Sequence, residues 1–138
     1  MHGFFTSKVV GVTFRNTNGA SRQNIIKNQC YVGQFVDLIH ELDNEKNKYA
    51  IKVKISDGPQ IGYLPNDLVD KQAIEKGLFH YYGFISKVGF YKEKNIHYLQ
   101  LRVGAFSLDE KQDDIIKLVE KELNNALHWC EIFNADWL

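Results

Sequence analysis

What the sequence has little of narrows the class of protein before any motif is considered. The chain of 138 residues contains only two cysteines, Cys30 and Cys130, and neither lies in a CxxC pair. We therefore expect reduced thiols rather than a disulfide, as in a cytoplasmic protein. The sequence has only two prolines and no low-complexity run, which argues against extended disorder. No apolar run approaches the length that crosses a bilayer, and the first residues lack the pattern of a secretory signal.

Motifs of common catalytic sites are also absent. The sequence has no GxxxxGK[ST] or GxGxxG for phosphates and no HExxH for zinc, and its five histidines are scattered. Acidic residues cluster only at Asp109–Glu110 and Asp113–Asp114, where they suit the positive end of a helix better than a metal site. Ser21 and Ser107 have no GxSxG context. We therefore predict that the chain is not an enzyme and needs no metal or cofactor.

Charge is balanced over the chain but unevenly distributed along it. The formal net charge is +0, yet Met1–Val36 carries four cations and no acid, and Lys46–Lys54 carries four lysines and no acid. Ser107–Leu138 carries eight acids and three lysines. Such asymmetry is typical of a protein with an anionic partner at one end, or of solvated faces that neutralise each other after folding. Charge alone does not separate the two interpretations.

Hydrophobic periodicity and turn residues predict several short strands and an early helix. The clearest strand is Tyr49–Ile55, where Tyr49, Ile51, Val53 and Ile55 alternate with Ala50 and two lysines. Ser21 can cap a short helix through Lys27. The remaining expected elements are strands at Lys8–Arg15, Phe35–Leu42, Gln60–Leu64, Tyr81–Tyr91 and Ile96–Val103, and a helix from Asn66 to Lys76 after Pro65.

The C-terminal part predicts one long amphipathic helix. Ser107-Leu108-Asp109-Glu110 has the form of a capping box, and an apolar stripe runs from Leu108 to Cys130. With the strands, this favours an α+β fold: a small antiparallel β-barrel of five to six strands with short helices and an added C-terminal helix. We expect one domain over residues 1–138, with the barrel at about 8–104 and the helix at about 108–130.

The order of features between Lys8 and Leu64 resembles a known family. The pieces are Val9–Phe14, Ser21–Ile26, Gly33, Val36–Leu38, Glu41–Asn44, Ala50–Val53 and Gln60–Leu64. Together they resemble the HIRAN domain, in the form of small stand-alone bacterial or phage proteins. The resemblance implies an OB-like barrel that grips single-stranded DNA at a free 3′ end. Family members occur beside helicase-like ATPases and RING fingers of fork-remodelling proteins, and nothing in this chain resembles either.

The resemblance also implies a pocket, which this sequence keeps in part. Phe14 retains the aromatic that stacks on a base, whereas Thr13 stands where an arginine is expected, and Arg15 follows. Asn44 matches the family's loop. Lys46 replaces a second stacking tyrosine.

Three further pocket positions also differ from the family pattern. Asn47 replaces the aspartate that would accept a hydrogen bond from a terminal hydroxyl. Tyr63 replaces a histidine, and Asn66 replaces a lysine. These substitutions reduce the selectivity for a 3′ end that the family would predict.

We therefore predict a nucleic-acid-binding accessory module. Its predicted contact residues are Thr13, Phe14, Arg15, Arg22, Asn44, Lys46, Asn47, Lys48, Lys52 and Tyr63. Alternatives remain for several of them: Phe14 and Tyr63 could be core aromatics, and Arg22 could cap the short helix or pair with Asp37. The competing function is a protein-interaction module that uses the acidic helix, with a helicase or nuclease as a possible partner. The oligomeric state is open.

Overall fold

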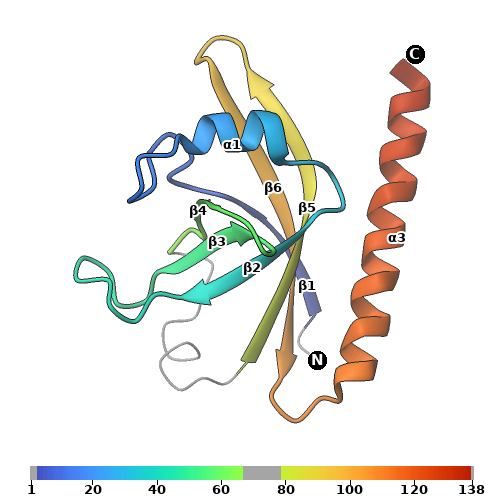
Figure 1. The fold of residues 1–138 in the computed structure, drawn as a ribbon. Coiled ribbons are helices and arrows are strands. Elements are labelled where there is room, and N and C mark those ends of the chain that lie inside the picture. The colour runs from blue at the N-terminus through green and yellow to red at the C-terminus, as the bar shows by residue number, and fades with distance from the viewer. Residues whose placement is uncertain (1–2, 67–78, 138) are drawn as a thin grey trace.

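Six antiparallel strands form one strongly curled sheet in the computed structural model, which describes residues 3–66 and 79–137, with side chains as far as His128 in the second range (Figure 1). The strand order is β1-β6-β5-β2-β3-β4. The predicted α+β class, with a barrel of five to six strands and a C-terminal helix, is confirmed. The elements are β1 (Gly3–Lys8), α1 (Arg22–Gln29), β2 (Phe35–His40), β3 (Ile51–Ile55), β4 (Gln60–Tyr63), β5 (Phe79–Tyr91), β6 (Ile96–Ser107) and α3 (Gln112–Trp137).

The two edges of the sheet meet just after β1. Val10 and Tyr63 exchange two backbone hydrogen bonds of 2.9 Å, which join the chain after β1 to the end of β4. Gly62 allows this approach because a β-carbon there would lie 2.5 Å from both the carbonyl oxygen of Val10 and Cγ1 of Val9. This isolated bridge joins the two edges of the curled sheet and closes the barrel at this end.

The barrel interior holds the larger of two hydrophobic cores. Alternate residues of β3 and β6 point inward, and Val53, Leu101 and Val103 are fully buried. The apolar face of α1 adds Ile25 and Ile26 to this core. Burying each such side chain contributes about 1.5–3 kcal/mol relative to leaving it exposed, so this core is the main source of stability.

A second core lies on the outer face of β5 and β6, beneath the first half of α3. Phe106 and Ile115 are buried there, and Phe4 and Tyr82 pack edge-on against the Phe106 ring. The two faces of β5 and β6 are therefore both covered over part of their length, one by the barrel core and the other by the helix. The predicted apolar stripe of the helix is confirmed at Ile115 and Val119.

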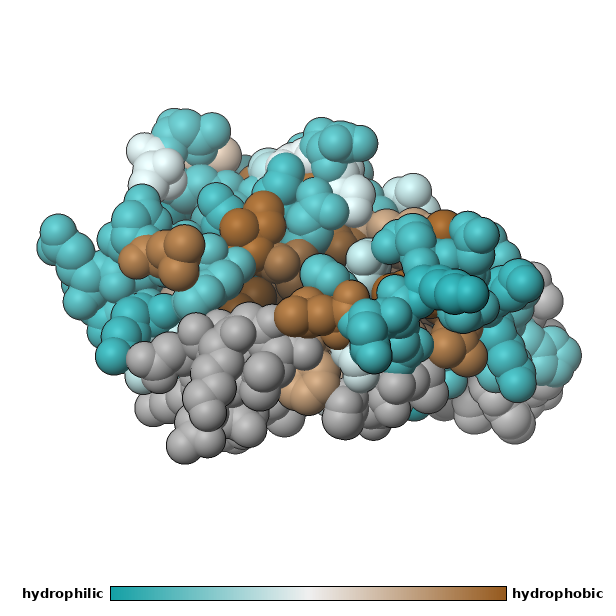
Figure 2. Space-filling view, turned by 90° about the horizontal axis from the view of Figure 1, so that it is seen from below, coloured by the Kyte–Doolittle hydropathy of each residue, from teal (hydrophilic) through white to brown (hydrophobic). Residues whose placement is uncertain are grey.

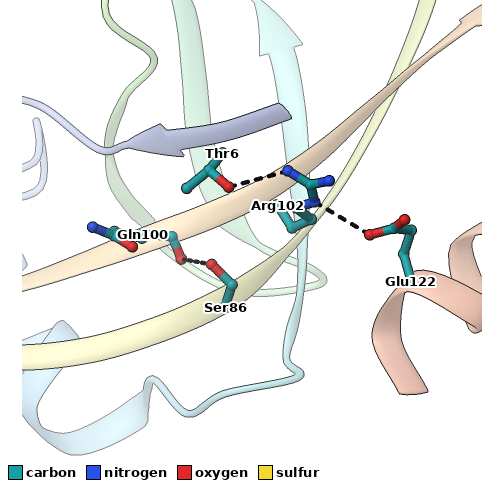
Figure 3. A network of polar contacts seen from close by, with 5 residues as sticks. All are labelled: Thr6, Ser86, Gln100, Arg102 and Glu122. Carbon is teal, nitrogen blue, oxygen red and sulfur yellow. Dashed lines mark hydrogen bonds and ion pairs between the residues drawn. The ribbon is translucent and has the colours of Figure 1, made fainter. Parts of the chain in front are cut away.

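A polar network holds α3 further along the sheet (Figure 3). The Arg102 guanidinium of β6 donates to the Glu122 carboxylate at 3.2 Å and to the Thr6 hydroxyl of β1 at 3.1 Å. Nearby, the Ser86 hydroxyl of β5 donates to the carbonyl of Gln100 at 3.3 Å. The Arg102–Glu122 pair joins the helix to the sheet beyond the last buried residue of the second core.

Two local predictions, the cap of the short helix and the alternation over Ile51–Ile55, are confirmed by the structure. Ser21 caps α1, and its hydroxyl accepts from the Asn24 amide at 3.2 Å. The turn after β3 contains Asp57 with φ of 58°, and a hairpin joins β5 to β6 through Asn95 with φ of 54°. β3 shows the expected alternation, with Ile51 buried.

The first strand and the start of the last helix were predicted at the wrong positions. β1 is Gly3–Lys8, upstream of the expected Lys8–Arg15, because Gly11 adopts φ of 72° and turns the chain. Ser107 is the last residue of β6, and α3 begins only at Gln112, so Ser107 and Glu110 do not form a capping box at its start. The helix predicted from Asn66 to Lys76 lies almost entirely outside the described residues.

Hydrophobic side chains also reach the surface in several places. From below, brown hydrophobic patches interrupt a largely hydrophilic surface (Figure 2). The described residues contain no helix with both the length and the apolar character needed to cross a membrane. They also contain no group of histidine, cysteine or acidic side chains placed to hold a metal ion.

Candidate nucleic-acid interface

A pocket of about 590 Å³ opens where the barrel closes. Its size lies within the range of about 300–1,000 Å³ that is typical of ligand pockets. The lining comes from the loop after β1, the loop between β2 and β3, and the end of β4. The lining residues are Val10, Gly11, Phe14, Asn44, Lys46, Asn47, Ala50, Tyr63, Leu64 and Asn66. Five of the ten predicted contact residues therefore line one pocket: Phe14, Asn44, Lys46, Asn47 and Tyr63.

Phe14 presents its ring to solvent at this pocket. Its side chain is 68% exposed, so it is not the core aromatic that one interpretation of the sequence allowed. A turn closed by the Phe14 amide and the Gly11 carbonyl, at 3.3 Å, sets its direction. A β-carbon on Gly11 would lie 3.6 Å from Phe14 Cδ2 and 3.7 Å from Tyr63 Cδ2, so both rings stand beside this glycine. An exposed ring held at a pocket can stack on a nucleobase.

Tyr63 is fixed in the pocket by groups on both of its sides. Its hydroxyl donates to the two carboxylate oxygens of Glu41, at 3.0 and 3.3 Å. The Arg22 guanidinium carbon lies 5.5 Å from the centre of its ring, within the range of a cation–π contact. One face of the ring is therefore held by a protein group, which pre-organises the pocket wall.

Arg22 is turned into the protein rather than toward solvent. Its side chain is buried, with Nε donating to Asn16 Oδ1 at 2.8 Å and Nη1 donating to the Gly11 carbonyl at 2.9 Å. These bonds hold the loop after β1 in place. The predicted phosphate contact of Arg22 therefore has no support in the geometry, and neither does the alternative of a pair with Asp37, which lies 3.8 Å from Lys54.

The asparagines of the β2–β3 loop mainly shape that loop. Asn44 Oδ1 accepts from the amides of Lys46 and Asn47, both at 3.0 Å, and its Nδ2 donates to Glu41 at 2.8 Å. Asn47 Oδ1 accepts from the Tyr49 amide at 3.0 Å, and its Nδ2 donates to Asn66 Oδ1 at 2.7 Å. Both side chains line the pocket, but their polar atoms already take part in hydrogen bonds within the protein.

The remaining predicted cations lie around the pocket rather than in it. Lys48 is exposed, and its ammonium lies 5.1 Å from the centre of the Tyr49 ring. Lys52 is the cross-strand partner of Tyr63 and so shares its face of the sheet. Arg15 is exposed and donates to the Gly19 carbonyl at 2.9 Å, and Thr13 is exposed but does not line the pocket.

Acidic residues interrupt the lysines of the β2–β3 loop. Glu41 lies at its start, and Asp43 and Glu45 are exposed within it. Glu41 is the functional candidate that the sequence analysis missed, because its link to Tyr63 joins residues 22 positions apart. The mixed charge predicts a surface of moderate rather than strong positive potential.

Cys30, the cysteine whose side chain the structure describes, is not activated as a nucleophile. Burial raises the pKa of the Cys30 thiol from 9.0 to about 11, so it stays protonated at neutral pH. It packs against the barrel core as a small apolar residue.

Comparison with known proteins places this chain in a family. The sequence model of the HIRAN domain matches residues 2–88, which is more than half of the chain and includes every residue of the pocket. Among solved structures, the HIRAN domain of human HLTF superposes with a TM-score of 0.55 at 20% identity, covering 91% of this chain and 89% of that one. A protein from Lactobacillus plantarum superposes with a TM-score of 0.50 at 20% identity, covering 73% of this chain and 98% of that one. No curated protein matches the sequence. The two superpositions support the OB-like fold, and the match to the sequence model shows that the chain belongs to the HIRAN domain family.

Proposed function

We propose that the chain is a non-catalytic module that binds single-stranded DNA in the pocket between the loop after β1 and the β2–β3 loop. Membership of the HIRAN family supports nucleic-acid binding as the general function. The observation that carries the proposal is the exposed ring of Phe14 at a pocket that Tyr63 also lines. Stacking on one such ring contributes about 1–3 kcal/mol per base and tolerates any base.

Phosphate attraction in this site would come from a few side chains. Lys46, Lys48, Lys52 and Arg15 lie at or around the pocket, while three acids stand in the same loop. For single strands each neutralised phosphate contributes about −0.7 to the slope of log affinity against log salt. Four contacts at most therefore give a slope no steeper than about −3. A much steeper slope would place the main contact on a different surface.

The central test replaces Phe14 by alanine and measures binding of a fluorescein-labelled oligothymidylate by fluorescence anisotropy at about 50 mM salt. Loss of the stacking ring should weaken binding by about 5- to 150-fold. Phe14→Tyr keeps the ring and should bind almost as the wild type does. Tyr31→Ala is the matched control, because Tyr31 is 62% exposed but lies outside the pocket. No binding by the wild type, or equal losses for the two alanine variants, would refute the proposal.

A second comparison tests whether the free 3′ end is recognised. In the pocket, Asn47 Oδ1 already accepts from the Tyr49 amide, and no charge strengthens a further bond to a terminal hydroxyl. We therefore propose that the pocket binds strands with little regard to their end chemistry. Oligonucleotides ending in a 3′ hydroxyl and in a 3′ phosphate should bind within about threefold of each other. A preference of more than about tenfold for the hydroxyl would show that end recognition persists.

A further inference from the structure

A second hollow, of about 300 Å³, lies between α3 and the start of β2, and shares no lining residue with the pocket beside Phe14. We call it the α3 groove. Its lining is mostly apolar and consists of Phe35, Tyr82, Gln112, Ile115, Ile116, Val119 and Glu120. Phe35 and Ile116 are each 45% exposed, although both stand beside the buried second core. Adjacent exposed apolar side chains of this kind mark an interaction site.

The apolar surface continues from the groove along one flank of α3. Leu123 and Leu127 follow Ile116 by seven and eleven residues, which keeps them on the same side of the helix. Both reach the loop before β2, since a β-carbon on Gly33 would lie 3.3 Å from Leu127 and 3.6 Å from Leu123. Leu127 remains 36% exposed. The row spans about 16 Å, or three helical turns.

The helix side of this surface is acidic. Asp113 and Glu120 stand three residues before and four residues after Ile116, so they border the groove on adjacent turns. Both are exposed, and among the described residues neither forms an ion pair. Lys117 lies four residues after Asp113 and three before Glu120, so it stands beside both acids and offsets part of their charge. The groove therefore offers apolar contacts beside a small excess of negative charge.

We propose that the α3 groove binds a basic amphipathic helix of a partner protein, with apolar side chains in the groove and lysine or arginine near Asp113 and Glu120. A row of apolar anchors three turns long fits a helix that presents residues at i, i+4 and i+7. A second copy of this chain is a poorer fit. Asp113 and Glu120 beside the groove would lie near the same acids of the other copy. Nucleic acid would meet the same repulsion.

The proposal does not depend on DNA binding. The family model ends at residue 88, whereas Gln112–Glu120 supply most of the α3 groove. The groove is thus built by a helix outside the matched segment. The β2–β3 loop and α3 also project on opposite sides of the sheet (Figure 1). A partner on α3 could be held while the pocket beside Phe14 stays open.

The test uses the full chain and three synthetic fluorescein-labelled peptides of about 18 residues, which is five helical turns. The first is a helix of leucine and lysine with one apolar stripe. The second has glutamate in place of lysine, and the third has the composition of the first in scrambled order. Anisotropy should show binding of the first peptide only. Ile116→Asp should weaken that binding by about tenfold or more, and Glu120→Lys should weaken it several-fold.

Leu42→Asp is the matched control, because Leu42 is 81% exposed in the β2–β3 loop, outside the α3 groove. It should bind the first peptide as the wild type does, and circular dichroism should show all variants folded. Equal binding of the scrambled peptide, or unchanged binding by Ile116→Asp, would overturn the proposal. So would a dimer in sedimentation velocity that Ile116→Asp converts to a monomer, because the groove would then be occupied by a second copy.

Discussion

Replacing Arg22 by methionine distinguishes a structural arginine from one that binds phosphate. The sequence alone allowed either role. In the structure the guanidinium is buried, donates to Asn16 and to the Gly11 carbonyl, and stacks on Tyr63. Methionine keeps most of the apolar stem but makes none of these contacts. The change should therefore lower stability first, and should lower DNA affinity only as a consequence.

The magnitude follows from the contacts of Arg22. Each hydrogen bond from a charged donor contributes about 1.5–3 kcal/mol, and the cation–π contact contributes about 0.5–2 kcal/mol. Asn16 and Gly11 are only half-buried, so water recovers part of the loss at both acceptors. We expect a decrease of about 3–5 kcal/mol in the free energy of unfolding. A domain has only about 5–15 kcal/mol in total, so the variant should be marginally stable.

Urea denaturation followed by circular dichroism measures the effect directly. With a dependence of about 1–3 kcal/mol per molar urea, the midpoint should fall by more than about 1 M. Arg15→Met is the control, since Arg15 is exposed and its removal should change stability by less than about 0.5 kcal/mol. An Arg22→Met variant that unfolds at the wild-type urea concentration but no longer binds DNA would refute the structural role. Arg22→Lys then serves as a check, because a phosphate-binding cation tolerates that change better than a buried bidentate donor does.

Three further changes probe the closure, the pocket and the core. Gly62→Ala inserts a β-carbon 2.5 Å from a backbone oxygen and should cost about 1–3 kcal/mol in chemical denaturation, whereas Gly83→Ala, with its nearest contact at 3.4 Å, should cost less. Glu41→Ala frees the Tyr63 hydroxyl and should weaken DNA binding by about 2- to 10-fold in anisotropy, while Glu41→Gln keeps an acceptor and should lose less. At pH 8, Cys30 should react with iodoacetamide about 100-fold more slowly in the folded than in the unfolded chain, because its pKa rises from 9.0 to about 11, as mass spectrometry of its peptide can show. The folded state binds that proton more tightly, so the contribution of the thiol to stability is complete below pH 9.0 and is lost as the pH rises through about 11.

The parts of the fold that depend on local chemistry could be predicted from the sequence. The alternation of apolar and polar residues correctly predicted which face of β3 points inward, and a capping serine correctly predicted where α1 begins. The first strand could not be placed in this way, because β-branched residues continue past Gly11 without a break. Its true position depends on pairing with β6, nearly 100 residues away. Ser107 was misassigned for the same reason, since pairing with Phe79 extends β6 to Ser107, the first residue of the apparent capping box.

The candidate site, like the fold, could be predicted from the sequence only in part. Phe14, Asn44, Lys46, Asn47 and Tyr63 were found because their loops resemble the family's sequence, and the structure brings all five to one pocket. The resemblance gave positions but not the direction of each side chain. It therefore could not show that the Arg22 side chain is buried, or that Glu41 accepts a hydrogen bond from the Tyr63 hydroxyl. Those facts depend on contacts between residues that are distant in the sequence.

The two faces of the sheet explain how one small domain can carry two independent surfaces. Closure of the barrel at Val10 and Tyr63 places the pocket at the end of β4, within the segment that the family model matches. The outer face of β5 and β6 is a separate layer, because Tyr82 and Phe106 pack there while Ile85 and Leu101 fill the barrel. A helix added after β6 can cover that layer without disturbing the residues that shape the pocket. Changes along α3 should therefore alter partner choice while leaving the pocket geometry intact, and the converse holds for the loops around Phe14.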